Sequence, residues 1–97
     1  MPQWVQLEWQ GPRTFSRIEF YTTQAYELRN FVIQYQPTLG GPFVALNPTP
    51  AFPTNNAATH LTFSFAPVSA FAIRVLANTG SAAQPGYARI NEIEVYP

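Results

Sequence analysis

The segment AFAIRVLANTGSAAQPGYARINEIEVY, residues 70–96, places two apolar strands on either side of one polar loop. In the first strand Ile73 and Val75 share one face and Arg74 takes the other, which is the period-2 pattern of a half-buried strand. In the second strand isoleucine and valine alternate with glutamates, and either a bulge lies near Asn91 or the strand starts after it. The glycines and prolines between the strands predict a surface loop, which is where binding residues tend to lie.

Five upstream segments repeat the same alternation of apolar and polar residues. They span residues 4–9, 16–21, 31–35, 43–46 and 61–65. Gly11-Pro12 and Ala66-Pro67 are expected to end two of them, and a Gly-Gly turn at residues 40–41 predicts a hairpin. Proline and glycine interrupt every stretch long enough for a helix. The chain is therefore expected to be all-β, with seven short strands in an antiparallel jelly-roll β-sandwich.

The composition indicates one small, uncharged domain that covers residues 1–97. Its 97 residues can bury a single core, and the aromatic content of 15% favours sheet over helix. Charged residues make up only 10% and the net charge is zero, so no basic surface exists for nucleic acid or for an anionic membrane. The absence of cysteine excludes disulfides and thiolate metal sites. These limits favour an uncharged ligand.

The order of these segments resembles the discoidin domain, also called the coagulation-factor type C domain, and the related family 32 carbohydrate-binding modules. The resemblance rests on four motifs: WVQLEW at residues 4–9, IQY at 33–35 before the Gly-Gly turn, AFAIRV at 70–75, and EIEVY at 92–96. It covers nearly all of this chain, whereas the part of the family's domain that precedes the tryptophan strand has no counterpart here. The resemblance implies a galactose-binding-like fold and a non-catalytic module, extracellular or secreted as part of a larger precursor.

Two departures from the family limit what the resemblance implies. Most ligands of the family's structural calcium come from the region that has no counterpart, which leaves Glu92 as one carboxylate for a cation that takes about six to eight oxygens. We therefore expect no metal ion and no cofactor. Thr22 and Thr23 stand where galactose-type modules commonly have an arginine, and the single histidine, His60, lies elsewhere. The resemblance thus implies glycan stacking without galactose specificity.

The loop before the last strand contains the first candidate for glycan binding, Tyr87, because its ring offers an apolar face to a sugar. Asn78 and Arg89 flank Tyr87 with amide and guanidinium groups that can hydrogen-bond sugar hydroxyls. Tyr26 and Arg29 belong to a second loop, which in this fold lies near the same edge. The alternative is that Tyr87 packs its loop against the sandwich and that the second loop is solvated without a ligand.

Catalysis finds no support in the sequence. The chain has one histidine and no aspartate, so a nucleophilic triad cannot be assembled from the usual residues. Glu92 and Glu94 share a strand face at a spacing that a glycosidase pair would need, but the faces of a sandwich are convex and lack a pocket. We therefore expect that the protein is not an enzyme and has no catalytic residue.

Four residues that stand out in the sequence receive structural interpretations. Trp4 and Trp9 begin and end a strand whose middle is expected to be buried, so they are expected to cover the core or its edge. His60 starts a strand and is expected at the surface. Arg74 is expected to pair across the sheet with a glutamate of the last strand, Glu92 or Glu94.

Three functions are compared. The first is binding of a neutral glycan through loops at one edge of the sandwich. The alternative is a structural or protein-interaction domain of the same fold, which self-associates through the sheet edge that the missing strand leaves open. The third is lipid binding with Phe52 as an apolar spike, which five arginines and the absence of lysine disfavour.

Overall fold

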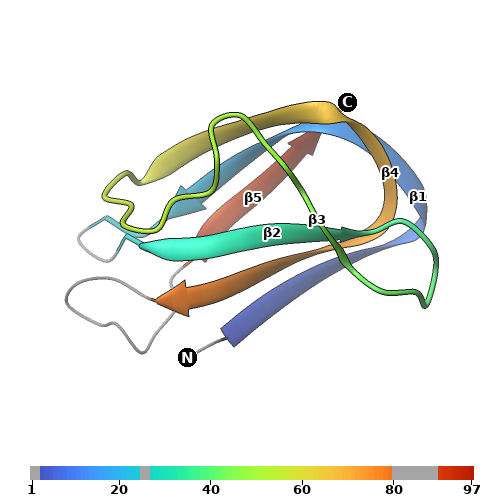
Figure 1. Ribbon diagram of the computed structural model, residues 1–97, viewed down its shortest axis with the longest axis horizontal. Coiled ribbons are helices and arrows are strands. Elements are labelled where there is room, and N and C mark those ends of the chain that lie inside the picture. Colours follow the sequence, from blue (N-terminus) through green and yellow to red (C-terminus); the bar gives the residue numbers. More distant parts are fainter. Residues whose placement is uncertain (1–2, 25–26, 80–89) are drawn as a thin grey trace.

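The computed structural model describes residues 3–24, 27–79 and 90–97 (Figure 1). The strands are β1 (Gln3–Thr22), β2 (Asn30–Gln36), β3 (Val44–Ala45), β4 (His60–Thr79) and β5 (Ile90–Tyr96). All five belong to one antiparallel sheet in the order β3-β2-β4-β1-β5. The described residues contain no helix, and therefore none that could cross a membrane. The predicted all-β class is confirmed.

β1 and β4 run side by side, bend together and pass from one layer of a sandwich to the other (Figure 1). Residues 3–8 of β1 pair with residues 72–77 of β4, and together with β2 and β3 they form the four-stranded layer. Residues 13–21 of β1 pair with residues 60–70 of β4, and together with β5 they form the three-stranded layer. A single folded sheet therefore supplies both faces of the core.

The predicted count of seven strands is wrong, because two pairs of predicted strands are continuous. Gly11-Pro12 lies in a register shift of β1 after Glu8, and Pro67 of β4 lies in a second shift opposite Ser16. Residues in a bulge are left out of the ladder, so a proline without an N–H bends the strand there instead of ending it. The bulge predicted near Asn91 is confirmed by the register shift between β1 and β5.

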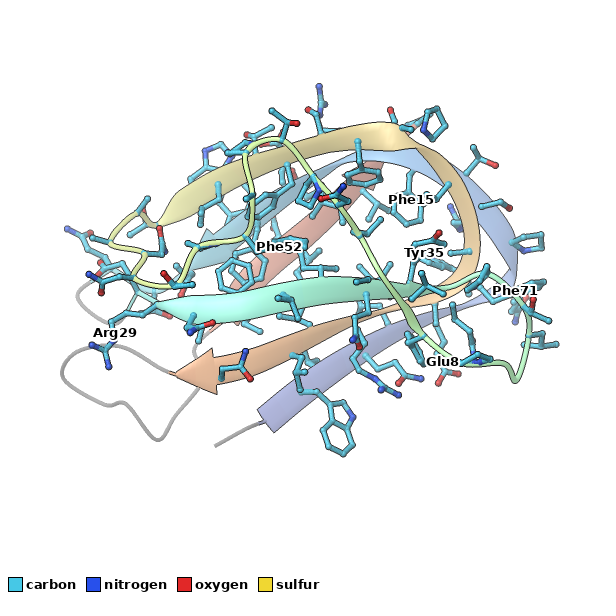
Figure 2. The ribbon with its side chains drawn as sticks, in the orientation of Figure 1. Glu8, Phe15, Arg29, Tyr35, Phe52 and Phe71 are labelled. Carbon is cyan, nitrogen blue, oxygen red and sulfur yellow. The ribbon has the colours of Figure 1, made fainter. Side chains whose placement is uncertain are left out.

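The core lies between the two layers and is largely aromatic. Phe20 of the three-stranded layer stacks on Phe31 of the four-stranded layer, with ring centroids 4.5 Å apart. Phe63 meets Phe31 edge-on, at 6.0 Å and an interplanar angle of 82°. Phe52 comes from the loop between β3 and β4, lies between the layers and contacts Phe63 at 4.9 Å (Figure 2). The hypothesis of an apolar spike at Phe52 is wrong, because its ring helps to close the core.

The predicted hairpin between β2 and β3 is confirmed by the pairing of Gln34 with Ala45. Gly40 adopts a φ of 75°, the left-handed region in which a side chain would be strained. The N–H of Gly41 donates to the carbonyl of Thr38 at 2.8 Å and closes the turn. Glycine at position 40 therefore allows the chain to reverse here.

β1 leaves one edge of the four-stranded layer open, because residues 3–8 pair with β4 on one side only. Val5 and Leu7 lie opposite residues of β4 that are only 1% exposed, yet they are themselves 41% and 40% exposed. The prediction that the middle of this strand is buried is wrong. No strand of the described chain covers this edge, so inward-facing side chains stay accessible to water.

Candidate functional site

One end of the four-stranded layer collects polar side chains from β2, β4 and the segment before β2. β2 begins at Asn30 and β4 ends at Thr79, and these two residues pair with each other. The Asn78 amide donates to Oδ1 of Asn30 at 3.4 Å, and Arg29 lies at the same end, away from the bends of β1 and β4 (Figure 2). We call this end the amide edge. Its Asn78 and Arg29 are two of the residues that the sequence suggested for glycan binding.

The other three suggested residues, Tyr26, Tyr87 and Arg89, lie outside the residues that the structure describes. The segments that contain them leave the described chain after Gln24 and after Thr79. Their role in binding stays a prediction.

Asn56 fastens the long loop between β3 and β4 to the amide edge, and sequence reasoning missed this residue. Its side-chain amide donates to the carbonyls of Leu28 at 3.0 Å and Ala58 at 2.8 Å. Its backbone N–H donates to the carbonyl of Arg29 at 2.9 Å. Adjacent asparagines between prolines signal a turn, but the partners 28 residues away could not be read from spacing. The loop is therefore tied to the backbone next to Arg29.

The chemistry of the amide edge suits uncharged hydroxyl groups. Amides of Asn30 and Asn78 can each donate and accept, and the Arg29 guanidinium donates only. The bond between the two asparagines, at 3.4 Å, is longer than the range typical of strong N–H···O bonds. A hydroxyl of a ligand can therefore compete for these amides at little cost.

Arg74 lies on the outer face of the four-stranded layer and does not pair with Glu92 or Glu94, so that prediction is wrong. Its guanidinium carbon lies 3.9 Å from the ring centroid of Phe43 and 5.6 Å from that of Trp4. The physical reason is the bend of β4: position 74 belongs to the four-stranded layer, whereas β5 belongs to the three-stranded layer.

The two tryptophans have different environments. Trp9 packs against the core, with its ring 5.9 Å from that of Phe15, as the sequence predicts. Trp4 is 65% exposed, and the expectation that it covers the core is wrong. Trp4 lies opposite Leu76 on the face of β1 that points away from the core, so its indole projects outward.

The outer face of the three-stranded layer is centred on Glu19. The Thr62 hydroxyl donates to Glu19 at 2.7 Å, His60 Nε2 lies 2.6 Å away, and Arg17 forms an ion pair with it at 3.2 Å. His60 also stacks on Tyr21, with centroids 4.4 Å apart. The hydrogen bond from Thr62, followed by that from His60, lowers the pKa of Glu19 below its ordinary value of 4.5. The prediction that His60 is a surface residue is confirmed.

A pH titration should separate two glutamates of this face. The pKa of Glu92 is raised above 4.5 by its hydrogen bond with Glu94 and by the charge of Glu94. Glu19 should therefore stabilise the fold above pH 4.5, and this contribution should be lost as the pH falls through its lowered pKa. Glu92 should do the opposite: it should stabilise the fold below pH 4.5, and this contribution should be lost as the pH rises through its raised pKa. NMR titration of the side-chain carboxyl carbons measures both midpoints.

Two substitutions test this prediction further. Glu92→Gln removes the repulsion from Glu94 and should raise the melting temperature at neutral pH, whereas Glu19→Gln should lower it. Equal titration midpoints for Glu19 and Glu92 would contradict the assignment.

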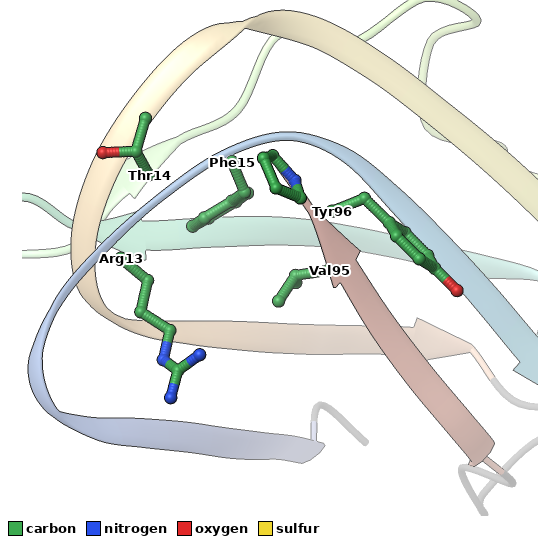
Figure 3. A pocket seen from close by; sticks show the side chains of 6 residues that line it. Arg13, Thr14, Phe15, Val95 and Tyr96 are labelled. Atoms are coloured by element: carbon green, nitrogen blue, oxygen red, sulfur yellow. The ribbon is translucent and has the colours of Figure 1, made fainter.

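The described residues offer little to an acid–base mechanism. They contain no group of three or more metal-ligating side chains. A cavity of about 240 Å³ lies between the bend of β1 and the end of β5 (Figure 3). Its lining consists of Arg13, Thr14, Phe15, Val95, Tyr96 and Pro97. No carboxylate or imidazole side chain is among these residues.

Comparison with models of protein families and with curated proteins finds no match. Solved structures do match. Chitosan-binding module 2 of a chitosanase/glucanase from Paenibacillus sp. IK-5, in complex with chitotriose, superposes with a TM-score of 0.79 and 24% identity over 100% of this chain and 71% of that one. A family 32 module from C. perfringens in complex with galactose gives 0.79 and 22% over 100% and 68%. A pectin-binding module gives 0.77 and 24% over 99% and 67%.

The chain therefore has the β-sandwich fold of carbohydrate-binding modules. Family 32 modules are among the structures with this fold, so the resemblance seen in the sequence is confirmed at the level of the fold. The chain spans 67 to 71% of the three structures described above.

Proposed function

We propose that this chain is a non-catalytic module that binds a neutral glycan through loops at one edge of the sandwich. The observation that carries the proposal is the match of the whole chain to modules whose structures hold chitotriose or galactose. We further propose that the module acts outside the cell as part of a larger secreted protein, as the sequence resemblance implies.

The amide edge supports the choice of site. Asn78 and Arg29 were selected from the sequence for hydrogen bonding to sugars, and they lie at one end of the same layer. Tyr87 and Arg89 belong to the segment that follows Asn78 in the chain, and Tyr26 to the segment that precedes Arg29. A net charge of zero supports a neutral glycan, because no surplus charge attracts an acidic or a basic polymer.

The absence of catalysis is also part of the proposal. Three glutamates, Glu19, Glu92 and Glu94, lie on the open outer face of the three-stranded layer, and none of them lines the cavity at the end of β5. A glycosidase pair needs two carboxyl groups that face one cleft, whereas these carboxyl groups face the outside of a sheet layer.

Calorimetric titration with galactose, N-acetylated chitotriose and a galactose trisaccharide, all of them uncharged, tests the proposal. Binding of at least one ligand is expected, with an affinity that changes little between low and high salt. Tyr87→Ala should weaken it about tenfold through loss of stacking, and Asn78→Ala about threefold to tenfold through loss of a hydrogen bond. Gln10→Ala is the control, since Gln10 lies exposed in the bend of β1 at the other end of the sandwich.

Two results would argue against this function. Failure to bind any of the three ligands removes the glycan proposal. Sedimentation velocity on the same samples examines self-association through the open edge at residues 3–8, and a dimer that forms without sugar would support the interaction domain instead.

A further inference from the structure

The outward face of the four-stranded layer presents ordered rows of side chains across three strands. Strand alternation puts every second residue of β1, β4 and β2 on this face, and the registers align them. The rows are Trp4–Leu76–Val32, then Gln6–Arg74–Gln34, then Glu8–Ala72–Gln36. We call these nine residues, with Phe43 beside them, the outer track. It holds one cation, one carboxylate and three glutamines, so its net charge is zero.

The side chain of Trp4 is 65% exposed, whereas Trp9 packs against the core. Leu76 and Val32, which lie in the same row as Trp4, are half-buried, so the ring of Trp4 lies beside a small apolar surface. Because most of the indole is exposed to water, its burial against a ligand would release hydrophobic free energy. The exposed ring is therefore available to stack on a flat apolar surface such as a face of a sugar.

Arg74 is held firmly beneath this ring. Phe43 stacks on one side of its guanidinium at 3.9 Å, and Trp4 approaches at 5.6 Å. Arg74 Nε is buried and has no hydrogen-bond partner among the described residues. A buried cationic donor without a partner costs stability, which favours a role for Arg74 other than packing.

The neighbouring polar groups are already oriented. Arg74 Nη2 donates to Gln6 Oε1 at 3.4 Å, and the Gln6 amide donates to Glu8 Oε1 at 2.7 Å. The resulting line of guanidinium, amide and carboxylate runs along the track beside Trp4. The short bond between Gln6 and Glu8 orients these two groups, so they lose little conformational freedom on binding. The bond from Arg74, at 3.4 Å, is as long as the one between Asn78 and Asn30, so a ligand hydroxyl can compete for it.

We propose that the outer track is a second contact surface for the glycan, on which Trp4 stacks against one sugar ring and Gln6, Glu8 and Arg74 hydrogen-bond its neighbours. Asn78 follows Leu76 on the same face of β4, about 7 Å along the strand, so the track continues from the amide edge. The ligand is then a neutral oligosaccharide that runs across the sheet, not a single terminal sugar. This inference rests on the proposed glycan-binding function. The mixture of one indole with amides and paired charges suits sugars better than an apolar protein surface.

Tryptophan fluorescence and calorimetry with N-acetylated chitotriose, a galactose trisaccharide and the corresponding monosaccharides test the proposal. Trp4→Ala should weaken binding of the preferred trisaccharide about threefold to tenfold and leave its monosaccharide unaffected. Trp4→Phe should retain most of the affinity, since a ring remains. Trp9→Phe is the matched control, because Trp9 packs on the core and should not change binding. The ligand-induced blue shift of emission should persist in Trp9→Phe and disappear in Trp4→Phe.

The outcomes separate this inference from the function on which it rests. If Asn78→Ala weakens trisaccharide binding and Trp4→Ala does not, the edge site stands and the outer track is wrong. If only a monosaccharide binds, the edge site stands and the outer track is wrong. If neither trisaccharides nor monosaccharides bind, both proposals fall. If Trp4 emission shifts with protein concentration alone, Trp4 lies in a contact between copies of the chain, and the track as a glycan surface is overturned.

Discussion

Replacing Phe31 with alanine should destabilise the protein by about 3–5 kcal/mol, the largest effect expected of a single substitution here. Phe31 is fully buried and contacts three other phenylalanine rings, two from the three-stranded layer and one from the loop before β4. Its removal leaves a cavity between layers that share one continuous sheet, so the surroundings can collapse only in part. A domain of this size has about 5–15 kcal/mol of stability in total, so the variant should be close to unfolding.

Chemical denaturation monitored by circular dichroism measures this loss. In a thermal melt of the same samples, the melting temperature should fall by about 12 °C or more. Phe31→Leu keeps most of the apolar volume and should lose less, and Phe52→Ala should also lose less because Phe52 is only partly buried. A loss below about 1 kcal/mol for Phe31→Ala would show that the aromatic contacts between the layers contribute little.

The second large effect is expected at Thr22, which is 2% exposed and polar. Its hydroxyl oxygen accepts a hydrogen bond from the N–H of Leu28 at 3.0 Å, within the buried part of the amide edge. Thr22→Val keeps the shape but leaves this N–H buried without a partner, which should cost about 1–3 kcal/mol. It should also speed hydrogen exchange at the Leu28 amide.

Thr22→Ser provides the matched control. Serine keeps the oxygen that accepts the hydrogen bond and lacks only a methyl group, so the Leu28 amide should stay protected and the loss of stability should be smaller. Equal effects of valine and serine at position 22 would mean that the hydroxyl does not stabilise this turn. Because Leu28 precedes Arg29, loss of the bond should also weaken glycan binding at the amide edge.

The candidate site was partly predictable. Asn78 and Arg29 were expected near one edge of the fold, and the structure places them at the same end of the four-stranded layer, while their role in binding stays a prediction. Asn56 was missed, since its bonds to Leu28 and Arg29 connect segments that only the folded chain brings together. Trp4 was expected to cover the core or its edge because it begins a strand whose middle was expected to be buried, and that strand instead lies at an open edge of the sheet.

The sequence by itself determined the all-β class and the hairpin at the Gly-Gly turn, whereas the choice between a bulge near Asn91 and a later strand start was made by the register of β1 and β5. These features depend on local physics: side chains alternate with a period of two, glycine permits a positive φ, and proline cannot donate to a ladder. The tertiary structure alone decided that seven predicted strands are five, and that Arg74 and the glutamates of β5 lie in different layers. Where a strand bends and which neighbour it meets depend on burial summed over both layers, and no local pattern contains that information.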